Sequence, residues 1–194
     1  MTSTFHLTAE LERLVADIAA TVAEFSHIDP TRLLVCVNSS RNSQHGAFAK
    51  IHHLRFQGGE RVQIVRRGRS SYRCTMPQIS HKGADILYVI YFTLPRFMDR
   101  PFKEKLVTIF HELYHISPRF DGDIRRFSGK NFAHGSSAKK YNQLMESFVE
   151  GYLQLPATSG KSAFLDHDMA ALRAKYGMIV GRRMAMPKIT VERV

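Results

Sequence analysis

Residues 85–115 read DILYVIYFTLPRFMDRPFKEKLVTIFHELYH. Residues 85–94 are nearly all apolar and rich in β-branched and aromatic side chains, which predicts a buried strand. In residues 101–115 the apolar side chains recur at helical spacing, which predicts a helix that buries one face. Asp99 is a candidate cap, Pro101 suits the first turn and Pro118 ends the helix. A strand, a short loop and a helix are therefore expected in that order.

The end of the predicted helix carries the spacing H-E-x-x-H at residues 111–115. On a helix that turns about 100° per residue, His111 and His115 lie roughly 40° apart on one face. Both imidazoles can therefore reach one metal ion, and Glu112 points to the side of that face, where it can hold a water molecule. Two imidazoles and a carboxylate at this spacing are typical of zinc hydrolases.

A catalytic zinc site usually has a third protein ligand and one open coordination position. Four later residues are candidates for this ligand: Asp121, His134, Glu146 and Glu150. We favour His134, because the chain has enough length after His115 to leave the helix and return. Gly135 permits a sharp bend there, and Ser136 or Ser137 can cap a following helix.

His-Glu-Leu-x-His followed after an insertion by His-Gly resembles the SprT/Spartan group of zinc metallopeptidases. It is still more similar to the small proteins grouped as putative phage metallopeptidases, over about residues 85–155. The resemblance implies an α+β, zincin-like single domain. Its small mixed twisted sheet would pack against an N-terminal helix and the H-E-x-x-H helix, with a further C-terminal helix.

The reaction that the motif and the resemblance imply is zinc-dependent hydrolysis of peptide bonds in a protein or peptide substrate. Glu112 would be the general base for a metal-activated water, with Zn²⁺ held by His111, His115 and His134. Other polar residues are candidates for binding the oxyanion (Tyr114, Tyr141) or for orienting an imidazole (Asp85, Asp123, Glu146). One alternative is a non-catalytic, zinc-containing module that binds nucleic acid or has a regulatory role. Another is a metal-dependent hydrolase that cleaves a non-peptide bond, such as an amide or ester.

Composition limits the class of protein. An apolar fraction of 44% and a charged fraction of 23% in 194 residues are ordinary for one soluble domain. We expect no membrane span, no secretory signal and a cytoplasmic location, because no apolar run approaches about 20 residues. Cys36 and Cys74 lie in apolar segments and are expected to be reduced core residues.

The formal net charge of +11 favours polyanionic partners, so nucleic acid or nucleoprotein is a possible partner through a basic surface. Basic residues form four short local runs: Arg66-Arg67-Gly68-Arg69, Arg125-Arg126, Lys139-Lys140 and Arg182-Arg183.

The remaining patterns predict an N-terminal helix capped by Thr8 with its apolar stripe ending at Phe25. They predict strands at 33–37, 47–56, 61–66 and 72–76, and helices at 137–155 and 163–175. Residues 1–157 are expected to form the metallopeptidase domain. Residues 158–194 would be a basic C-terminal extension packed on or trailing from it, and 176–194 have no predicted element.

Overall fold

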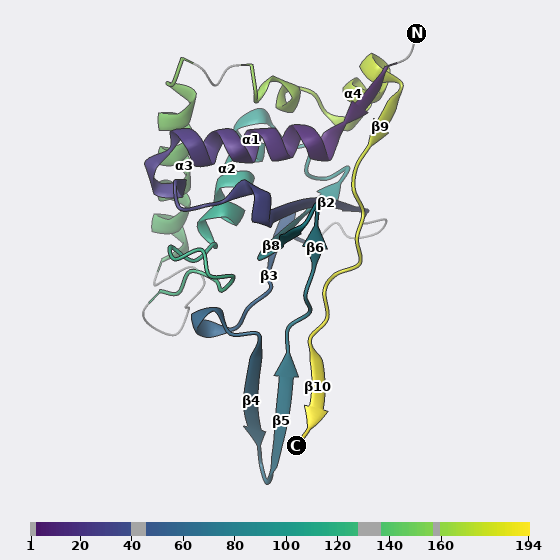
Figure 1. Cartoon of the computed structure of the whole chain (residues 1–194). Helices are drawn as coiled ribbons and strands as arrows, with labels where there is room; N and C mark the ends of the chain where they lie inside the picture. The colour runs from purple at the N-terminus through teal and green to yellow at the C-terminus, as the bar shows by residue number, and fades with distance from the viewer. Residues whose placement is uncertain (1–2, 40–45, 128–136, 157–159) are drawn as a thin grey trace.

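A three-stranded mixed sheet of order β2–β8–β3 lies at the centre of the fold. In the computed structural model, which describes residues 3–39, 46–127, 137–156 and 160–194, β2 (Leu33–Ser39) runs parallel to β8 (Tyr88–Leu94). The third strand, β3 (Ala49–His53), is antiparallel to β8 and forms one edge. Figure 1 shows the helices on one side of this sheet. The predicted α+β class with a small mixed sheet is therefore confirmed.

Both faces of the sheet are buried, which explains the nearly continuous apolar sequence of β8. Tyr88, Ile90 and Phe92 face a large core shared with the helices. Val89 and Tyr91 point the other way, into a smaller cluster covered in part by Met184. Successive strand residues alternate between faces, so both cores require apolar residues.

The helices and 3-10 turns follow the predicted order. Their bounds are α1 Leu7–Thr21, α2 Phe102–Tyr114, α3 Ala138–Leu153 and α4 Met169–Tyr176, with short turns at Ala23–Phe25, Pro30–Arg32, Gln57–Gly59 and Ala163–Asp166. Ser137 caps α3 through its hydroxyl, as predicted. The single helix predicted for 163–175 is wrong, because the Asp168 side chain accepts the N–H of Ala171 and begins a separate helix there.

Two predicted caps are also wrong. Thr8 lies inside the first turn of α1, where its hydroxyl accepts the backbone N–H of Arg182. Asp99 lies before the N-cap of α2, and its carboxylate accepts the N–H of Met169. Each side chain binds a distant segment of the chain and does not cap its helix.

The predicted strand 85–94 is divided in two. Ala84–Asp85 (β7) pairs with Ser80–His81 (β6), and the ladder with β2 begins only at Tyr88. Between them, the N–H of Ile86 donates to Ile79 and that of Leu87 donates to Arg32. These bonds direct two buried residues away from the central sheet.

The C-terminal residues, for which the sequence predicts no element, return to earlier strands. Met178–Val180 (β9) pairs in parallel with Thr4–His6 (β1). Thr190–Arg193 (β10) pairs with β5 (Ser70–Thr75), which also pairs with β4 (Val62–Arg67). The proposed boundary at 157/158 falls at residues 157–159, outside the described residues, and stays a prediction.

Two further findings concern the cysteines and the helices. Cys36 is buried and Cys74 is half-buried, and both are free thiols. Among the described residues, every helix is too short or too polar to cross a lipid bilayer.

Candidate active site

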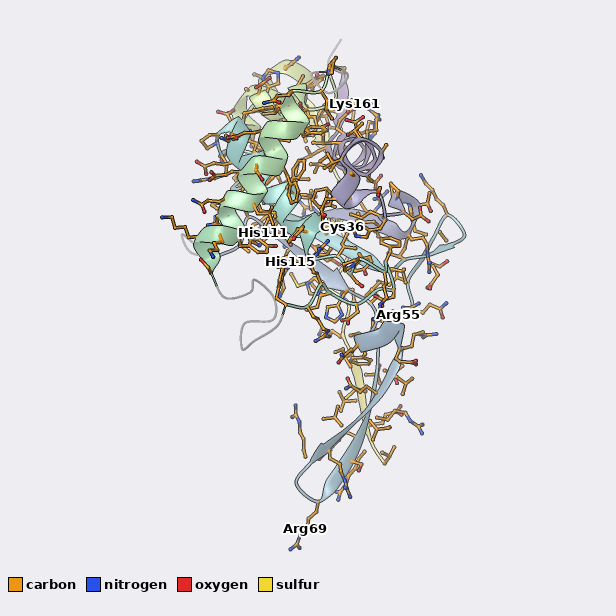
Figure 2. The ribbon with its side chains drawn as sticks, turned by 90° about the vertical axis from the view of Figure 1, so that its left-hand side faces the viewer. Cys36, Arg55, Arg69, His111, His115 and Lys161 are labelled. Atoms are coloured by element: carbon orange, nitrogen blue, oxygen red, sulfur yellow. The ribbon has the colours of Figure 1, made fainter. Side chains whose placement is uncertain are left out.

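His111 and His115 lie at the C-terminal end of α2, where His115 is the C-cap residue. Their ring centroids are 4.8 Å apart with an interplanar angle of 77°, and both side chains are half-buried. Figure 2 shows them side by side below α3. The helical spacing has therefore brought two imidazoles to one side of the helix.

Glu112 lies between these two residues in sequence and is buried, with 7% of its surface exposed. One carboxylate oxygen, Oε2, accepts the backbone N–H of Ile51 on β3 over 2.8 Å. Burial raises the pKa of the Glu112 carboxyl to about 7, although the Ile51 N–H and the charge of Lys50 act in the opposite direction. The carboxyl group of Glu112 is therefore fixed at the edge of the sheet, where it has little contact with solvent.

A pocket of about 200 Å³ adjoins His111 and Glu112. Val107 and Thr108 of α2 line one side, and residues 47–49 at the start of β3 line another. The Phe48 carbonyl accepts the N–H of Thr93, so even-numbered residues of β3 bond to β8. The peptide groups of Ala49 and Ile51 therefore face outward, because antiparallel pairing alternates.

Tyr141 of α3 lies against both imidazoles. Its ring centroid is 5.0 Å from that of His111 and 6.0 Å from that of His115. Its hydroxyl donates to the backbone carbonyl of His111 over a long 3.5 Å, and burial raises the pKa of this phenol. Tyr114 instead faces an aromatic cluster with Phe25, and Arg125 stacks on its ring at 4.0 Å.

The loop after α2 holds His115 in place. Ile116 forms an isolated antiparallel bridge with Ile124, and the N–H of Arg125 donates to the His115 carbonyl over 2.7 Å. The side chain of Arg125 is only 13% exposed and pairs with Glu24 at 2.9 Å. Arg125 therefore supports the site and is not part of an exposed basic surface.

One comparison with known proteins identifies the family. A family described as "Putative phage metallopeptidase" matches residues 4–149. The chain belongs to this family. The match starts at β1 and includes β3, the H-E-x-x-H helix and most of α3, so it begins far before residue 85, where the expected resemblance starts, and ends at residue 149 instead of 155. No curated protein and no solved structure matches the chain.

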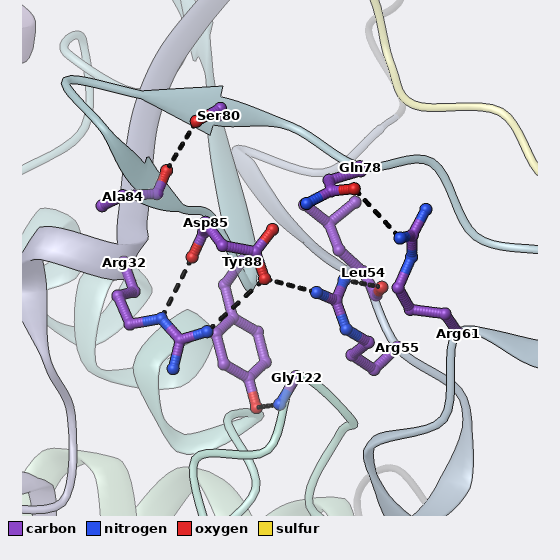
Figure 3. A network of polar contacts seen from close by, with 10 residues as sticks. All are labelled: Arg32, Leu54, Arg55, Arg61, Gln78, Ser80, Ala84, Asp85, Tyr88 and Gly122. Atoms are coloured by element: carbon purple, nitrogen blue, oxygen red, sulfur yellow. Dashed lines mark hydrogen bonds and ion pairs between the residues drawn. The ribbon is translucent and has the colours of Figure 1, made fainter.

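Four of the other carboxylates that the sequence suggests for this site have partners of their own. Figure 3 shows Asp85 paired with Arg55 at 2.5 Å and with Arg32 at 3.5 Å. Each of the others pairs with a basic residue nearby: Asp121 with Arg119 (3.2 Å), Asp123 with Arg126 (2.9 Å) and Glu150 with Lys103 (2.8 Å). Glu146 lies exposed on α3.

The third ligand is not visible in the described part of the chain. His134 lies outside the described residues, as do Gly135 and Ser136. Within residues 3–39, 46–127, 137–156 and 160–194, no three His, Cys, Asp or Glu side chains lie close enough together to hold a metal ion. The roles of His111, His115 and His134 as metal ligands therefore stay predictions.

Sequence reasoning missed the backbone N–H of Ile51, which contacts Glu112 from a residue 61 positions earlier. A strand was predicted across Ile51, but nothing in the sequence of that strand indicates that its outer edge faces α2. Arg125 was missed for a similar reason, since its partner Glu24 lies in a distant turn.

Proposed function

We propose that this chain is a zinc-dependent metallopeptidase that hydrolyses peptide bonds in proteins or peptides. The observation that supports this most is the half-buried imidazole pair, 4.8 Å apart, next to a buried carboxylate. Imidazole nitrogens at helical spacing fit Zn²⁺, which binds His readily. His111, His115 and His134 are the proposed ligands. When bound, zinc supplies Lewis acidity that lowers the pKa of a water molecule and polarises a carbonyl.

Glu112 is the proposed general base. It takes a proton from the attacking water and passes it to the leaving amine. The Ile51 N–H restricts the carboxylate to one orientation during this transfer. Tyr141, in contact with both imidazoles, is the better candidate to donate a hydrogen bond to the oxyanion. Tyr114 and Glu146 remain alternatives for the oxyanion and for orienting an imidazole.

The substrate would bind as an extended strand along the outer edge of β3. The peptide group of Ala49 and the carbonyl of Ile51 face this edge, whereas the Ile51 N–H is bonded to Glu112. The adjoining pocket can take one substrate side chain. Pairing of this kind reads the backbone more than the side chains. We therefore expect tolerance of many sequences around the scissile bond.

The test measures zinc content and casein digestion with and without a chelator. Glu112→Gln should keep zinc and lower kcat by about 10²–10⁴-fold, because the amide cannot take a proton. Glu60→Gln, which changes an exposed carboxylate, is the matched control. Equal digestion by wild type and Glu112→Gln would contradict the role of Glu112, and the absence of chelator-sensitive digestion by wild type would favour the non-catalytic alternative.

A second variant addresses the third ligand. His134→Ala should lower zinc occupancy, because only two imidazoles would then hold the ion. Unchanged zinc occupancy in His134→Ala would favour Glu146 or Glu150 as the third ligand.

A further inference from the structure

Strands β4, β5 and β10 form an arm that extends away from the helices and the central sheet (Figure 1). The turn between β4 and β5 contains Gly68, with a φ of 59°, and Figure 2 shows Arg69 at the far end. Neither face of the arm is covered by another element, since Ile64 is 54% exposed and Val191 is 59% exposed. The arm is thus a separate surface, remote from α2.

The arm is strongly basic. Residues 61–76 contain five arginines and no Asp or Glu, and β10 adds Glu192 and Arg193. Three arginines in the basic runs of the body differ from these, because Arg125, Arg126 and Arg182 each form an ion pair with a carboxylate. Among the described residues, no ion pair includes the exposed arginines of the arm: Arg66, Arg67, Arg69, Arg73 and Arg193.

These arginines are distributed over both faces of the arm. Residues paired across antiparallel strands share a face, as do residues two positions apart on one strand. Arg73 is opposite Ile64, which is two positions from Arg66, so Arg73 and Arg66 lie on one face. Arg193 is opposite Tyr72, which is opposite Val65, and so lies on the face of Arg67. Apolar residues also occur on both faces. The arm therefore lacks the segregated apolar face that binding at a lipid surface uses.

The tip of the arm is a β-hairpin. β10 pairs with β5 as far as Arg193, opposite Tyr72, and the Val194 N–H donates to the Ser71 carbonyl, so among the described residues the tip around residues 66–71 is a two-stranded ribbon. The major groove of B-DNA is about 12 Å wide and admits such a ribbon, with a phosphate backbone on each side. The corresponding groove of duplex RNA is too narrow.

We propose that the arm binds double-stranded DNA, with arginines on its two faces contacting the phosphates on either side of the major groove. The contacts are to the backbone, so binding is independent of sequence and depends strongly on salt. The proposal does not depend on the peptidase activity, and the arm would hold the protein on DNA.

The test uses the full chain and a fluorescein-labelled DNA duplex, with binding followed by anisotropy from about 50 to about 200 mM salt. The variant Arg66→Gln/Arg67→Gln/Arg69→Gln should bind at least about tenfold more weakly. Its plot of log affinity against log salt should be shallower by about 3. Its thermal midpoint should match wild type, since these side chains are exposed and form no ion pair.

A control variant, Arg13→Gln/Lys139→Gln/Arg173→Gln, removes the same charge from exposed residues of three helices and should keep most of the affinity. Equal losses in the two variants would overturn the proposal, as would failure of wild type to bind DNA at about 50 mM salt. Tighter binding to duplex RNA, to phosphatidylserine vesicles or to polyglutamate than to DNA would overturn it too.

Discussion

The backbone N–H of Ile51 donates a hydrogen bond to the Glu112 carboxylate over 2.8 Å. Ile51 lies on the free edge of the central sheet, and Glu112 on the helix that carries both imidazoles. This bond joins the edge at which a substrate strand would bind to the residue that would move the proton. A carboxylate held in this way needs no rearrangement before it acts.

Ile51→Pro tests this relationship. The Ile51 N–H points away from β8, so proline removes the bond to Glu112 and leaves the ladder of β3 and β8 intact. We expect kcat for casein to fall by about 10- to 100-fold, the effect of losing a hydrogen bond to a charged group, with zinc content unchanged. Ile51→Val keeps the N–H and should retain activity. Equal rates for the two variants would contradict the role given to this bond.

Gly122 supports the loop that holds His115, and we predict that it tolerates no side chain. Its φ is 86°, and a Cβ atom would lie 2.5 Å from the Cγ of Arg55. Its N–H donates to the Tyr88 hydroxyl over 2.9 Å, as Figure 3 shows. Gly122→Ala should therefore lower the free energy of unfolding by about 2 kcal/mol or more in urea titrations, and should lower activity as well.

The matched control is Gly83→Ala. Gly83 has a similar φ of 81°, but a Cβ atom there would meet nothing within 4 Å. Only the backbone strain remains, so the loss should be about 1 kcal/mol. Equal losses for the two glycines would show that the contact with Arg55 is unimportant.

Local patterns predicted the elements that carry the candidate site, because β8 is a nearly continuous apolar run rich in β-branched and aromatic residues and α2 has strong helical periodicity. The same patterns failed where a polar group has a distant partner. Thr8 and Asp99 resemble helix caps, but their oxygens bind the backbone of Arg182 and Met169. No short-range rule could predict these bonds, since each joins segments that meet only in the folded chain.

The sequence could not show which basic residues form ion pairs for the same reason, since the partners lie far apart along the chain. Arg125 and the arginines of the arm look alike in sequence, yet Arg125 is 13% exposed and paired with Glu24. A run of basic residues says nothing about acidic partners elsewhere in the chain. The strand β10 was missed because Thr190–Arg193 is exposed on an arm and lacks the alternation that a buried face would impose.

The two thiols should react at very different rates. Burial raises the pKa of Cys36 to about 11, so at pH 8 only about one molecule in a thousand carries the reactive thiolate. Cys36 is also fully buried, whereas Cys74 is half-buried on the arm. We expect iodoacetamide at about pH 8 to modify Cys74 in the folded protein, and Cys36 only after urea unfolds it. Mass spectrometry of wild type and Cys74→Ser checks this, and rapid labelling of folded Cys74→Ser would contradict it.

His52 should make the fold sensitive to acid. Its Nε2 atom is buried without a hydrogen-bond partner among the described residues, and its ring packs against Tyr91. Burial lowers the pKa of His52, and the charges of Lys50 and His53 lower it further. In the unfolded chain the pKa of His52 is about 6.5, so the unfolded chain binds the proton more tightly than the folded protein does. The stability that neutral His52 contributes is complete above the pKa of His52 in the unfolded chain. It is lost as the pH falls from that value toward the lower pKa of His52 in the folded protein.

The thermal midpoint should thus fall between about pH 7.5 and about pH 5.5. His52→Phe keeps an aromatic ring against Tyr91 and removes the titrating group, so its midpoint should fall less over this range. The exposed His6 provides the control, and His6→Gln should follow wild type. Parallel curves for wild type and His52→Phe would mean that acid acts on other groups. Half-buried His27, whose pKa burial also lowers, would be the first to examine by the same substitution.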